Sequence, residues 1–189
     1  MPFDAFDDAS DDALMVLFAN GDGQAAAVLA QRHTSRVLAL GMRMLGDGAE
    51  AEDVAQEAML RLWKIAPDWR QGEAKVSTWL YRVAANLCTD RLRRRRSTDL
   101  DAIPEPVDET PSVEARMIGR DRVAAVRAAI DALPERQRLA MSLRFLQELP
   151  NPEVAAVMET TVEAVESLLA RGKRALAAGL AEARDDLGV

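Results

Sequence analysis

The basic charge of this chain is concentrated in one short segment. Arginine occurs six times within fifteen residues, at Arg82, Arg91, Arg93, Arg94, Arg95 and Arg96. Asn86 and Asp90 follow Arg82 at intervals of four residues, so these three side chains share one polar stripe if the segment is helical. Guanidinium groups bind phosphates and amide groups bond to base edges, which makes the segment a candidate nucleic-acid-binding site.

A second candidate surface is acidic. Asp53, Gln56 and Glu57 fall within one helical turn of each other, so all three side chains can reach the same partner. Carboxylates can form bidentate pairs with arginine, which is the chemistry that such a face offers to a partner. For an isolated acidic helix a solvated face is the alternative, because exposed carboxylates are common on protein surfaces. For this helix taken by itself the solvated face is the favoured interpretation.

Residues suited to other kinds of chemistry are sparse. The only histidine, His33, falls in a helical pattern without a nucleophile beside it, and the only cysteine, Cys88, cannot form an internal disulfide. No glycine-rich phosphate loop and no zinc-ligand spacing occurs, so no cofactor and no metal are predicted, and an enzyme is the least favoured class. His33 and Cys88 are interpreted as ordinary helical residues.

Composition places these residues on an all-α scaffold. The chain has 189 residues and is 49% hydrophobic but only 4% aromatic, a composition that favours helices over β-sheets. No apolar run is long enough to span a membrane and the N-terminus is acidic, so we expect a cytoplasmic protein without membrane insertion. The net charge of −7 argues against nonspecific coating of nucleic acid.

Helical periodicity organises the first half of the chain. Residues 1–23 are expected to form a frayed acidic leader and a first short helix, which Asp11 or Asp12 caps. Apolar residues then recur every three or four positions in three segments, which predicts a helix in each. These helices cover residues 24–45, 49–65 and 77–95. Together they make up the first predicted domain, residues 24–96.

An acidic stretch with three prolines separates the two halves. Residues 97–112 have no sustained apolar period, which predicts a flexible linker. A second domain is expected over residues 113–180 and a tail over 181–189. The second domain begins with an amphipathic helix over residues 113–133. Another helix follows Pro134, with Leu139, Leu143 and Leu146 predicted on its inner side.

Two helices joined by a short turn are the clearest local signal. Asn151 before Pro152 predicts an N-cap and the start of a short helix. Thr160 or Thr161 can cap a second helix that begins at Val162. Such a pair is a helix-turn-helix, in which the second helix recognises DNA. The expected fold is therefore all-α, with two small helical domains joined by a flexible linker.

Three stretches of this sequence resemble the extracytoplasmic-function sigma factors of the sigma-70 family. They are AEDVAQEAMLRLW at residues 51–63, VSTWLYRVAANLCTDRLRRRR at 76–96 and LPERQRLAMSLRFLQELPNPEVAAVMETTVEAVESLLARGKRAL at 133–176. Their order and their spacing around the acidic linker make the resemblance specific. It covers residues 24–96 and 113–180, which then correspond to the region 2 helical bundle and the region 4 helix-turn-helix of that family.

The resemblance implies a role for each surface of the first domain. In the family, the helix that carries Asp53, Gln56 and Glu57 binds the β′ coiled coil of core RNA polymerase, whose β subunit is a further partner. The arginine-ended helix and the loop before it bind and melt the −10 promoter element. The residues implied there are Trp69, Arg70, Gln71, Arg82, Asn86, Asp90, Arg91, Arg93 and Arg94. Trp79 is expected in the core.

In the second domain the resemblance implies recognition of the −35 element. The candidate residues are Glu163, Glu166, Ser167, Arg171, Lys173 and Arg174. Family members usually have a basic residue at the position of Glu166 and an arginine at that of Leu168, so this helix departs from the pattern. A glutamate can accept a hydrogen bond from cytosine but repels phosphates. Weak DNA binding by this domain alone is therefore expected.

The function implied is a sigma factor that binds core RNA polymerase and promoter DNA and is controlled by an anti-sigma factor. Such a partner holds the two domains together and hides their binding faces. Two alternatives remain. A sigma-like decoy would bind an anti-sigma factor but no promoter, and the net charge of −7 favours it slightly. A helix-turn-helix regulator would use residues 133–176 but leaves the acidic and arginine-rich segments unexplained.

Overall fold

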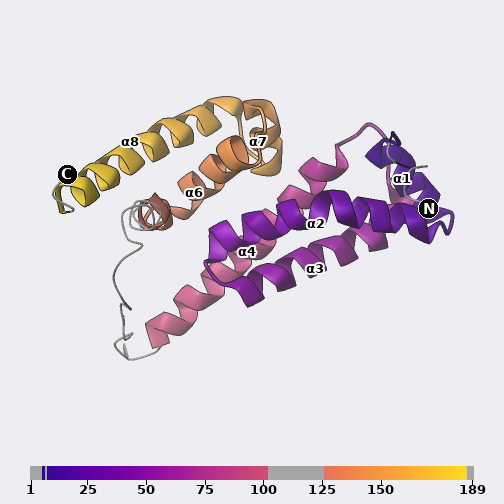
Figure 1. The fold of residues 1–189 in the computed structure, drawn as a ribbon, viewed down its shortest axis with the longest axis horizontal. Helices are drawn as coiled ribbons and strands as arrows, with labels where there is room; N and C mark the ends of the chain where they lie inside the picture. Colours follow the sequence, from indigo (N-terminus) through magenta and orange to yellow (C-terminus); the bar gives the residue numbers. More distant parts are fainter. Residues whose placement is uncertain (1–5, 7, 102–125, 187–189) are drawn as a thin grey trace, which may run out of the picture.

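The computed structural model of this chain is built from helices (Figure 1). It describes residues 6, 8–101 and 126–186, and these residues contain no strand. We call residues 8–101 the N-terminal unit and residues 126–186 the C-terminal unit. The prediction of an all-α fold is confirmed. Residues 102–112 of the predicted linker and most of the predicted helix at 113–133 lie outside the described residues.

The N-terminal unit is a bundle of three long helices with a short one at its end. Its elements are α1 (Asp11–Ala19), α2 (Gly23–Leu45), α3 (Gly48–Ile65), a 3-10 turn (Ala66–Asp68) and α4 (Val76–Asp101). The helices α2, α3 and α4 lie side by side, and α1 packs against α2 near the turn after α3 (Figure 1). Because α4 continues to Asp101, the first five residues of the predicted linker are helical.

Short polar side chains start the first three helices. Ser10, Asp22 and Asp47 accept hydrogen bonds from backbone N–H groups in the first turns of α1, α2 and α3, at distances between 2.9 and 3.2 Å. The prediction that Asp11 or Asp12 caps α1 was wrong, because Ser10 is the N-cap. The carboxylates of Asp11 and Asp12 instead bond to Arg32 of α2 and to Trp69 of the loop before α4, so the start of α1 is attached to the bundle.

The core of the N-terminal unit lies where the helices meet. Its fully buried side chains include Leu14, Met15, Leu29, Leu40, Val54, Leu62 and Leu80. Each such side chain contributes about 1.5–3 kcal/mol through removal of apolar surface from water. Helices α2 and α3 approach closely at Gly41, where a Cβ atom would lie 3.1 Å from Cα of Ala51. Glycine therefore allows this close crossing, where a side chain would require the backbone of α3 to shift by a few tenths of an ångström.

The C-terminal unit is smaller. Residues 126–131 are helical and are followed by α6 (Glu135–Met141), a π-helical turn (Ser142–Leu146), α7 (Asn151–Val157) and α8 (Val162–Asp186). Leu139, Leu143, Val154, Val165 and Leu169 are buried where α6, α7 and α8 pack together. The chain reverses between α7 and α8, with Glu159 at a φ of 49°. This arrangement is the predicted helix-turn-helix.

The structure corrects two details in this unit. Leu146 was expected on the inner side, but its exposed fraction is 52%, because the π-helical turn has more residues per turn than an α-helix and rotates Leu146 outward. Asn151 was expected as an N-cap, but α7 begins at Asn151 itself, after Pro150, without a side-chain cap bond. Of the two candidate threonines, Thr161 caps α8 through a bond from the N–H of Ala164.

Candidate functional site

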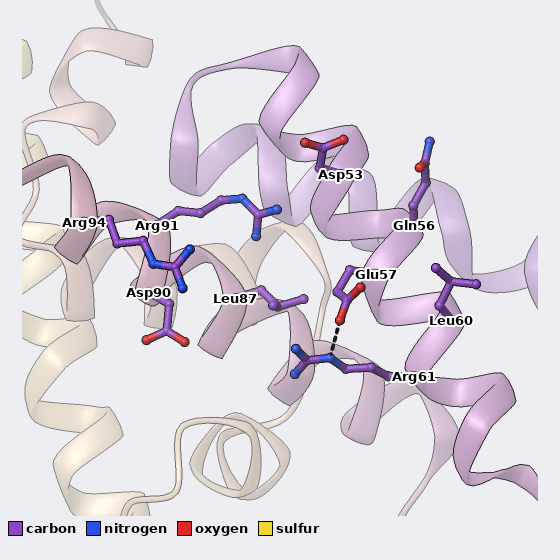
Figure 2. A pocket seen from close by; sticks show the side chains of 9 residues that line it. All are labelled: Asp53, Gln56, Glu57, Leu60, Arg61, Leu87, Asp90, Arg91 and Arg94. Atoms are coloured by element: carbon purple, nitrogen blue, oxygen red, sulfur yellow. Dashed lines mark hydrogen bonds and ion pairs between the residues drawn. The ribbon is translucent and has the colours of Figure 1, made fainter.

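The predicted acidic surface lies in a groove between α3 and α4 (Figure 2). The groove has a volume of about 500 Å³ and is lined by Asp53, Gln56, Glu57, Leu60, Arg61, Leu87, Asp90, Arg91 and Arg94. Asp53 and Gln56 are exposed and Glu57 is half-buried, with its carboxylate 2.8 Å from Nε of Arg61. The structure therefore brings the three predicted residues together on one wall of a groove.

Sequence reasoning missed an apolar component of this groove. Leu60 is 61% exposed and is the most exposed of the large hydrophobic residues described. It lies one turn after Gln56 on α3 (Figure 2). An exposed leucine beside carboxylates fits a partner that offers both apolar and basic groups. The spacing of four residues from Gln56 to Leu60 was the available signal.

The helical repeat separates the arginines of α4 from one another. Arg91 and Arg94 line the groove beside the acidic residues of α3 (Figure 2), whereas Arg93 is exposed and pairs with Asp90 at 3.0 Å. Arg95 donates to the carbonyl oxygen of Leu45 at 3.0 Å. Consecutive residues on a helix are about 100° apart, so the arginine run faces several different surroundings and cannot act as one patch.

Two further arginine contacts have a structural role. The guanidinium of Arg95 also lies 2.9 Å from the carboxylate of Glu50, which ties α4 to the start of α3. Arg96 forms an ion pair with Glu135 of α6 and so joins the two units. Neither arginine was assigned to promoter DNA on the basis of sequence. In the structure both form ion pairs that link helices.

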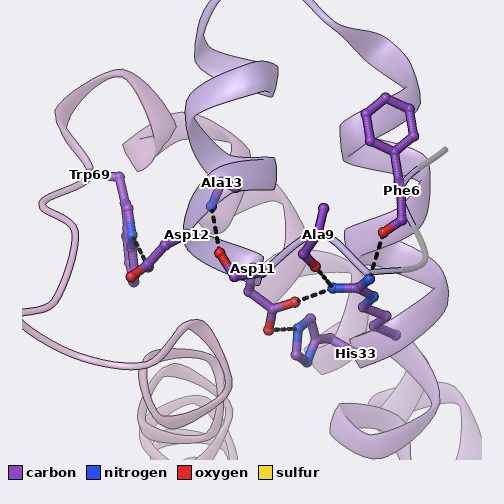
Figure 3. Close-up of polar contacts among 9 residues, drawn as sticks. Phe6, Ala9, Asp11, Asp12, Ala13, His33 and Trp69 are labelled. Carbon is purple, nitrogen blue, oxygen red and sulfur yellow. Dashed lines mark hydrogen bonds and ion pairs between the residues drawn. The ribbon is translucent and has the colours of Figure 1, made fainter.

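The loop between α3 and α4 presents two of its three predicted residues to solvent. Arg70 and Gln71 are exposed and Trp69 is half-buried. The indole ring of Trp69 lies edge-on to Trp79, with ring centroids 6.3 Å apart, and its N–H donates to Oδ1 of Asp12 at 2.9 Å (Figure 3). Trp79 packs partly buried against the core, as expected.

A polar cluster holds the start of α1 against α2 (Figure 3). The guanidinium of Arg32 donates to Oδ1 of Asp11 at 2.9 Å and to the carbonyl oxygen of Ala9 at 2.7 Å. Oδ2 of Asp11 lies 2.7 Å from Nε2 of His33. The hydrogen bond from His33 is the largest cause that holds the pKa of Asp11 below its usual value, with Arg32 acting in the same direction against burial. The lone histidine is therefore a structural residue.

Part of the segment of α4 that was predicted to bind DNA is covered by the C-terminal unit. Arg82 lies 3.7 Å from the carboxylate of Glu159, in the turn before α8, and the hydroxyl of Tyr81 donates to Gln147 at 2.7 Å. Lys75 also forms an ion pair with Glu153 of α7. Asn86, one turn beyond Arg82, is exposed. The two units are thus in contact through α4 and α7 (Figure 1).

On α8 the six predicted residues are all exposed, whereas Leu168 is buried. Leu168 packs in the core, so the side chain at that position faces away from the surface that carries Glu163 and Glu166. The carboxylate of Glu163 bonds to its own backbone N–H and to Thr161, which holds its pKa below the usual value. Lys173 lies above the ring of Phe145, at 5.1 Å from its centroid.

Potential metal ligands and the one thiol are the remaining reactive groups in the part of the chain that is described. No three histidine, cysteine, aspartate or glutamate side chains there lie close enough together to hold a metal ion. Burial raises the pKa of Cys88 to about 12, which keeps its thiol protonated at neutral pH. None of the described helices is long and apolar enough to cross a membrane.

Comparison with known proteins places both units in one family. Residues 29–98 match the family model of Sigma-70 region 2, and residues 124–176 match that of Sigma-70, region 4. The ECF RNA polymerase sigma-E factor of Escherichia coli is 32% identical over 178 residues, which cover 88% of this chain and 92% of that protein.

Two solved structures share the fold. CnrH in complex with the cytosolic domain of CnrY is 25% identical, with a TM-score of 0.68 over 91% of this chain and 97% of that one. The sigma factor RpoE from Bartonella quintana, in complex with the anti-sigma factor NepR, is 18% identical. Its TM-score is 0.65 over 82% of this chain and 95% of that one.

Proposed function

This chain belongs to the extracytoplasmic-function sigma factors of the sigma-70 family, and from that premise we propose how its surfaces share the work of transcription initiation. It is a transcription initiation factor rather than a catalytic enzyme. As a sigma factor it binds core RNA polymerase and directs it to promoters. The residues that make each contact are the subject of the proposal.

The groove between α3 and α4 is the proposed docking site for the β′ coiled coil of core RNA polymerase. It is the observation that carries the proposal, because it combines the carboxylates of Asp53 and Glu57 with the exposed side chain of Leu60. A basic helix with an apolar residue at its centre fits both features. Arg91 and Arg94 line the opposite wall, so we assign them to this docking site rather than to DNA phosphates.

The loop before α4 and the exposed face of α4 are the proposed contacts with the −10 element. Arg70 and Gln71 project from the loop and Asn86 from α4, and groups of these types can hold an unstacked base. Arg82 and Arg93 lie outside the docking groove and supply charge for phosphates. Trp69 is half-buried and bonded to Asp12, so its proposed role is to support the loop rather than to stack on a base.

The exposed face of α8 is the proposed contact with the −35 element. Glu166 and Ser167 lie in the first turns of this helix and are placed to bond to base edges. Arg171 and Arg174 follow one to two turns later and can reach the phosphates. Lys173 packs on Phe145, which supports the surface and reduces its freedom to follow a phosphate. Glu163 is engaged with the helix cap.

The contacts between the two units support control by an anti-sigma factor. Because Arg82 is paired with Glu159 and α7 packs on α4, the proposed −10 surface is partly covered in this arrangement. The units must separate before α4 can meet DNA along its whole length. The RpoE structure that shares this fold contains an anti-sigma factor, and a partner of that kind would act here by favouring the closed arrangement. We place this activity in the cytoplasm, where polymerase and promoters meet.

The test is reconstitution of the holoenzyme. The chain is mixed with core RNA polymerase and a library of genomic promoters, and open complexes are detected by permanganate reactivity of thymines at the −10 element. The proposal predicts thymine reactivity that depends on the chain and is lost when Asp53 and Glu57 are both replaced. A holoenzyme that forms but opens no promoter, together with tight binding of an anti-sigma factor, would instead identify a decoy.

A further inference from the structure

Asp12 lies outside every surface proposed so far, yet its carboxylate bonds twice to the loop before α4. Oδ1 accepts the indole N–H of Trp69 at 2.9 Å (Figure 3), and Oδ2 accepts the backbone N–H of Gly72 at 3.3 Å. Arg70 and Gln71, both exposed, lie between these two donors. One carboxylate therefore holds the loop on both sides of the residues that are proposed to meet the separated strand.

The support behind Asp12 is rigid. Its neighbour Asp11 is bonded to Arg32 and His33 of α2, and Ser10 caps the same helix. Leu14 and Met15, on the next turn of α1, are fully buried. The two adjacent carboxylates thus face opposite ways, since one fixes α1 to the bundle and the other fixes the loop to α1 (Figure 3).

The loop has few other attachments near its tip. Gly72 has a φ of 79°, a left-handed conformation that glycine adopts without strain. The pair between Arg70 and Glu73 is exposed, and exposed pairs of this kind add little stability. The edge contact of Trp69 with Trp79 fixes the start of the loop only. Within the loop the N–H of Glu73 lies 3.5 Å from the carbonyl oxygen of Arg70, and the bond from Gly72 to Asp12 ties this side of the loop to α1.

We propose that Asp12 is a positioning residue for promoter recognition, which holds Arg70 and Gln71 in the geometry that discriminates among −10 sequences. This inference rests on the proposed function of the loop. Ordering the loop in advance reduces the conformational entropy that is lost when it binds a base. It also fixes the direction of the side chains, on which the choice between bases depends.

The structural part of the inference is tested in the free chain. Hydrogen exchange of the Trp69 indole N–H and the Gly72 amide is measured by NMR for wild type, Asp12→Ala and Asp8→Ala. Asp8 is an exposed aspartate of the same segment, so its replacement removes the same charge. Asp12→Ala is expected to speed exchange at both groups by roughly tenfold, the effect of losing a charge-assisted bond. Asp8→Ala is expected to leave exchange at both groups unchanged. Neither variant should change exchange at the amides of α2 to α4.

The functional part is tested in the reconstituted holoenzyme at saturating core polymerase. Open-complex formation is compared on promoters that differ by one base at the −10 element and, separately, at the −35 element. Asp12→Ala is expected to lower −10 discrimination by roughly threefold to tenfold and to leave −35 discrimination unchanged. A loss of folding alone would lower activity on all promoters equally. Trp69→Phe keeps an aromatic ring but removes the indole N–H donor to Asp12, so its effect should not add to that of Asp12→Ala.

The two measurements separate the ways in which the inference can fail. Unchanged exchange at Trp69 and Gly72 in Asp12→Ala would show that the carboxylate does not hold the loop. Faster exchange with unchanged −10 discrimination would show that the held geometry does not matter for recognition. A wild-type holoenzyme that opens no promoter would overturn the proposed function and this inference with it, whatever the exchange rates show.

Discussion

The two helices proposed to meet promoter DNA, α4 and α8, differ in the charge of their exposed side chains. The proposed contacts on α4 are cationic, whereas the first ones on α8 are anionic. On α4 the side chains proposed for phosphates are Arg93, which is exposed, and Arg82, which is half-exposed. On α8 the first exposed side chains are Glu163 and Glu166, and cations begin only at Arg171. Phosphate attraction is therefore concentrated in the N-terminal unit. The comparison suggests that α4 holds the DNA and that α8 selects among sequences with little affinity of its own.

The same difference explains how the two units meet. Lys75, Arg82 and Arg96 of the N-terminal unit each pair with a glutamate of the C-terminal unit. The glutamates are Glu153, Glu159 and Glu135. These three glutamates thus occupy cationic side chains that lie at or near the surface proposed for promoter DNA. Under the proposed function, DNA and the C-terminal unit compete for Arg82 in particular.

The largest effect is expected at the docking groove, on which both helices depend for recruitment to polymerase. Asp53→Arg together with Glu57→Arg should weaken binding to core RNA polymerase by on the order of a hundredfold, because like charges would face each other across the interface. Glu52→Arg is the matched control, since Glu52 is exposed on α3 but does not line the groove. Binding is measured by fluorescence anisotropy of the labelled chain, with helical content checked by circular dichroism. Equal affinities for control and double variant would remove this face from the interface.

The next test concerns the arginines of α4, which the structure divides between the exposed face of the helix and the docking groove. Arg82→Ala with Arg93→Ala should lower the slope of promoter affinity against salt by about 1.8, since each lost phosphate contact removes about 0.9. Arg91→Ala with Arg94→Ala should instead leave that slope unchanged, because these two arginines line the docking groove rather than the proposed DNA surface. The measurement is holoenzyme binding to promoter DNA over a series of salt concentrations. The same loss of slope in both pairs would return Arg91 and Arg94 to the DNA contacts predicted from sequence.

The attachment of α1, which supports the loop of the N-terminal unit, predicts a pH dependence of stability. The pKa of Asp11 is depressed in the folded chain, so its contribution is complete above the unfolded pKa of about 3.9 and is lost as pH falls through the lower folded value. Asp11→Asn should cost roughly 1–2 kcal/mol at pH 7, and this difference should shrink in acid. Thermal unfolding of wild type and variant across pH measures it, with Asp8→Asn as control. A difference that persists at the lowest pH would mean that the charge of Asp11 is not its source.

A smaller effect is expected on α8. Glu163→Gln with Glu166→Gln should raise the affinity of the isolated C-terminal segment for −35 DNA by roughly threefold at low salt, and less as salt screens the charges. Discrimination in favour of cytosine should fall if either carboxylate accepts its amino hydrogen. Asp131→Asn, an exposed change elsewhere in the unit, is the control. The measurement is a binding titration on −35 duplexes with single base changes. A fall in affinity would mean that the hydrogen bonds between the two glutamates and the bases outweigh their repulsion of the phosphates.

The smallest effect concerns the contact between the units. Glu135→Gln, Glu153→Gln and Glu159→Gln together should shift the free chain towards an open form, because each ion pair contributes roughly 0.2–1 kcal/mol. Small-angle X-ray scattering should then give a larger radius of gyration than for wild type, and added salt should produce the same change in wild type. Glu166→Gln is the control, as it removes a charge away from these pairs. A radius unaffected by either salt or the triple variant would show that other contacts, such as that of Tyr81 with Gln147, hold the units together.

The amino-acid sequence by itself determined the helices and the surfaces that they carry. Apolar periodicity places the helices expected at 24–45 and 49–65 within a residue of α2 and α3, because local spacing decides which face can be buried. The acidic groove residues and the helix-turn-helix were predicted on the same ground. The family resemblance then supplied their roles, since the motifs that carry it are contiguous in the chain.

Only the tertiary structure decided which of these residues act together. The pairing of Asp12 with Trp69 spans 57 residues, and the division of the arginines of α4 depends on which face α3 approaches. Leu146 turned outward because a π-helical turn changed the register. No local pattern encodes such contacts: they follow from how helices pack and how far side chains reach across the interface, and both depend on the whole chain at once.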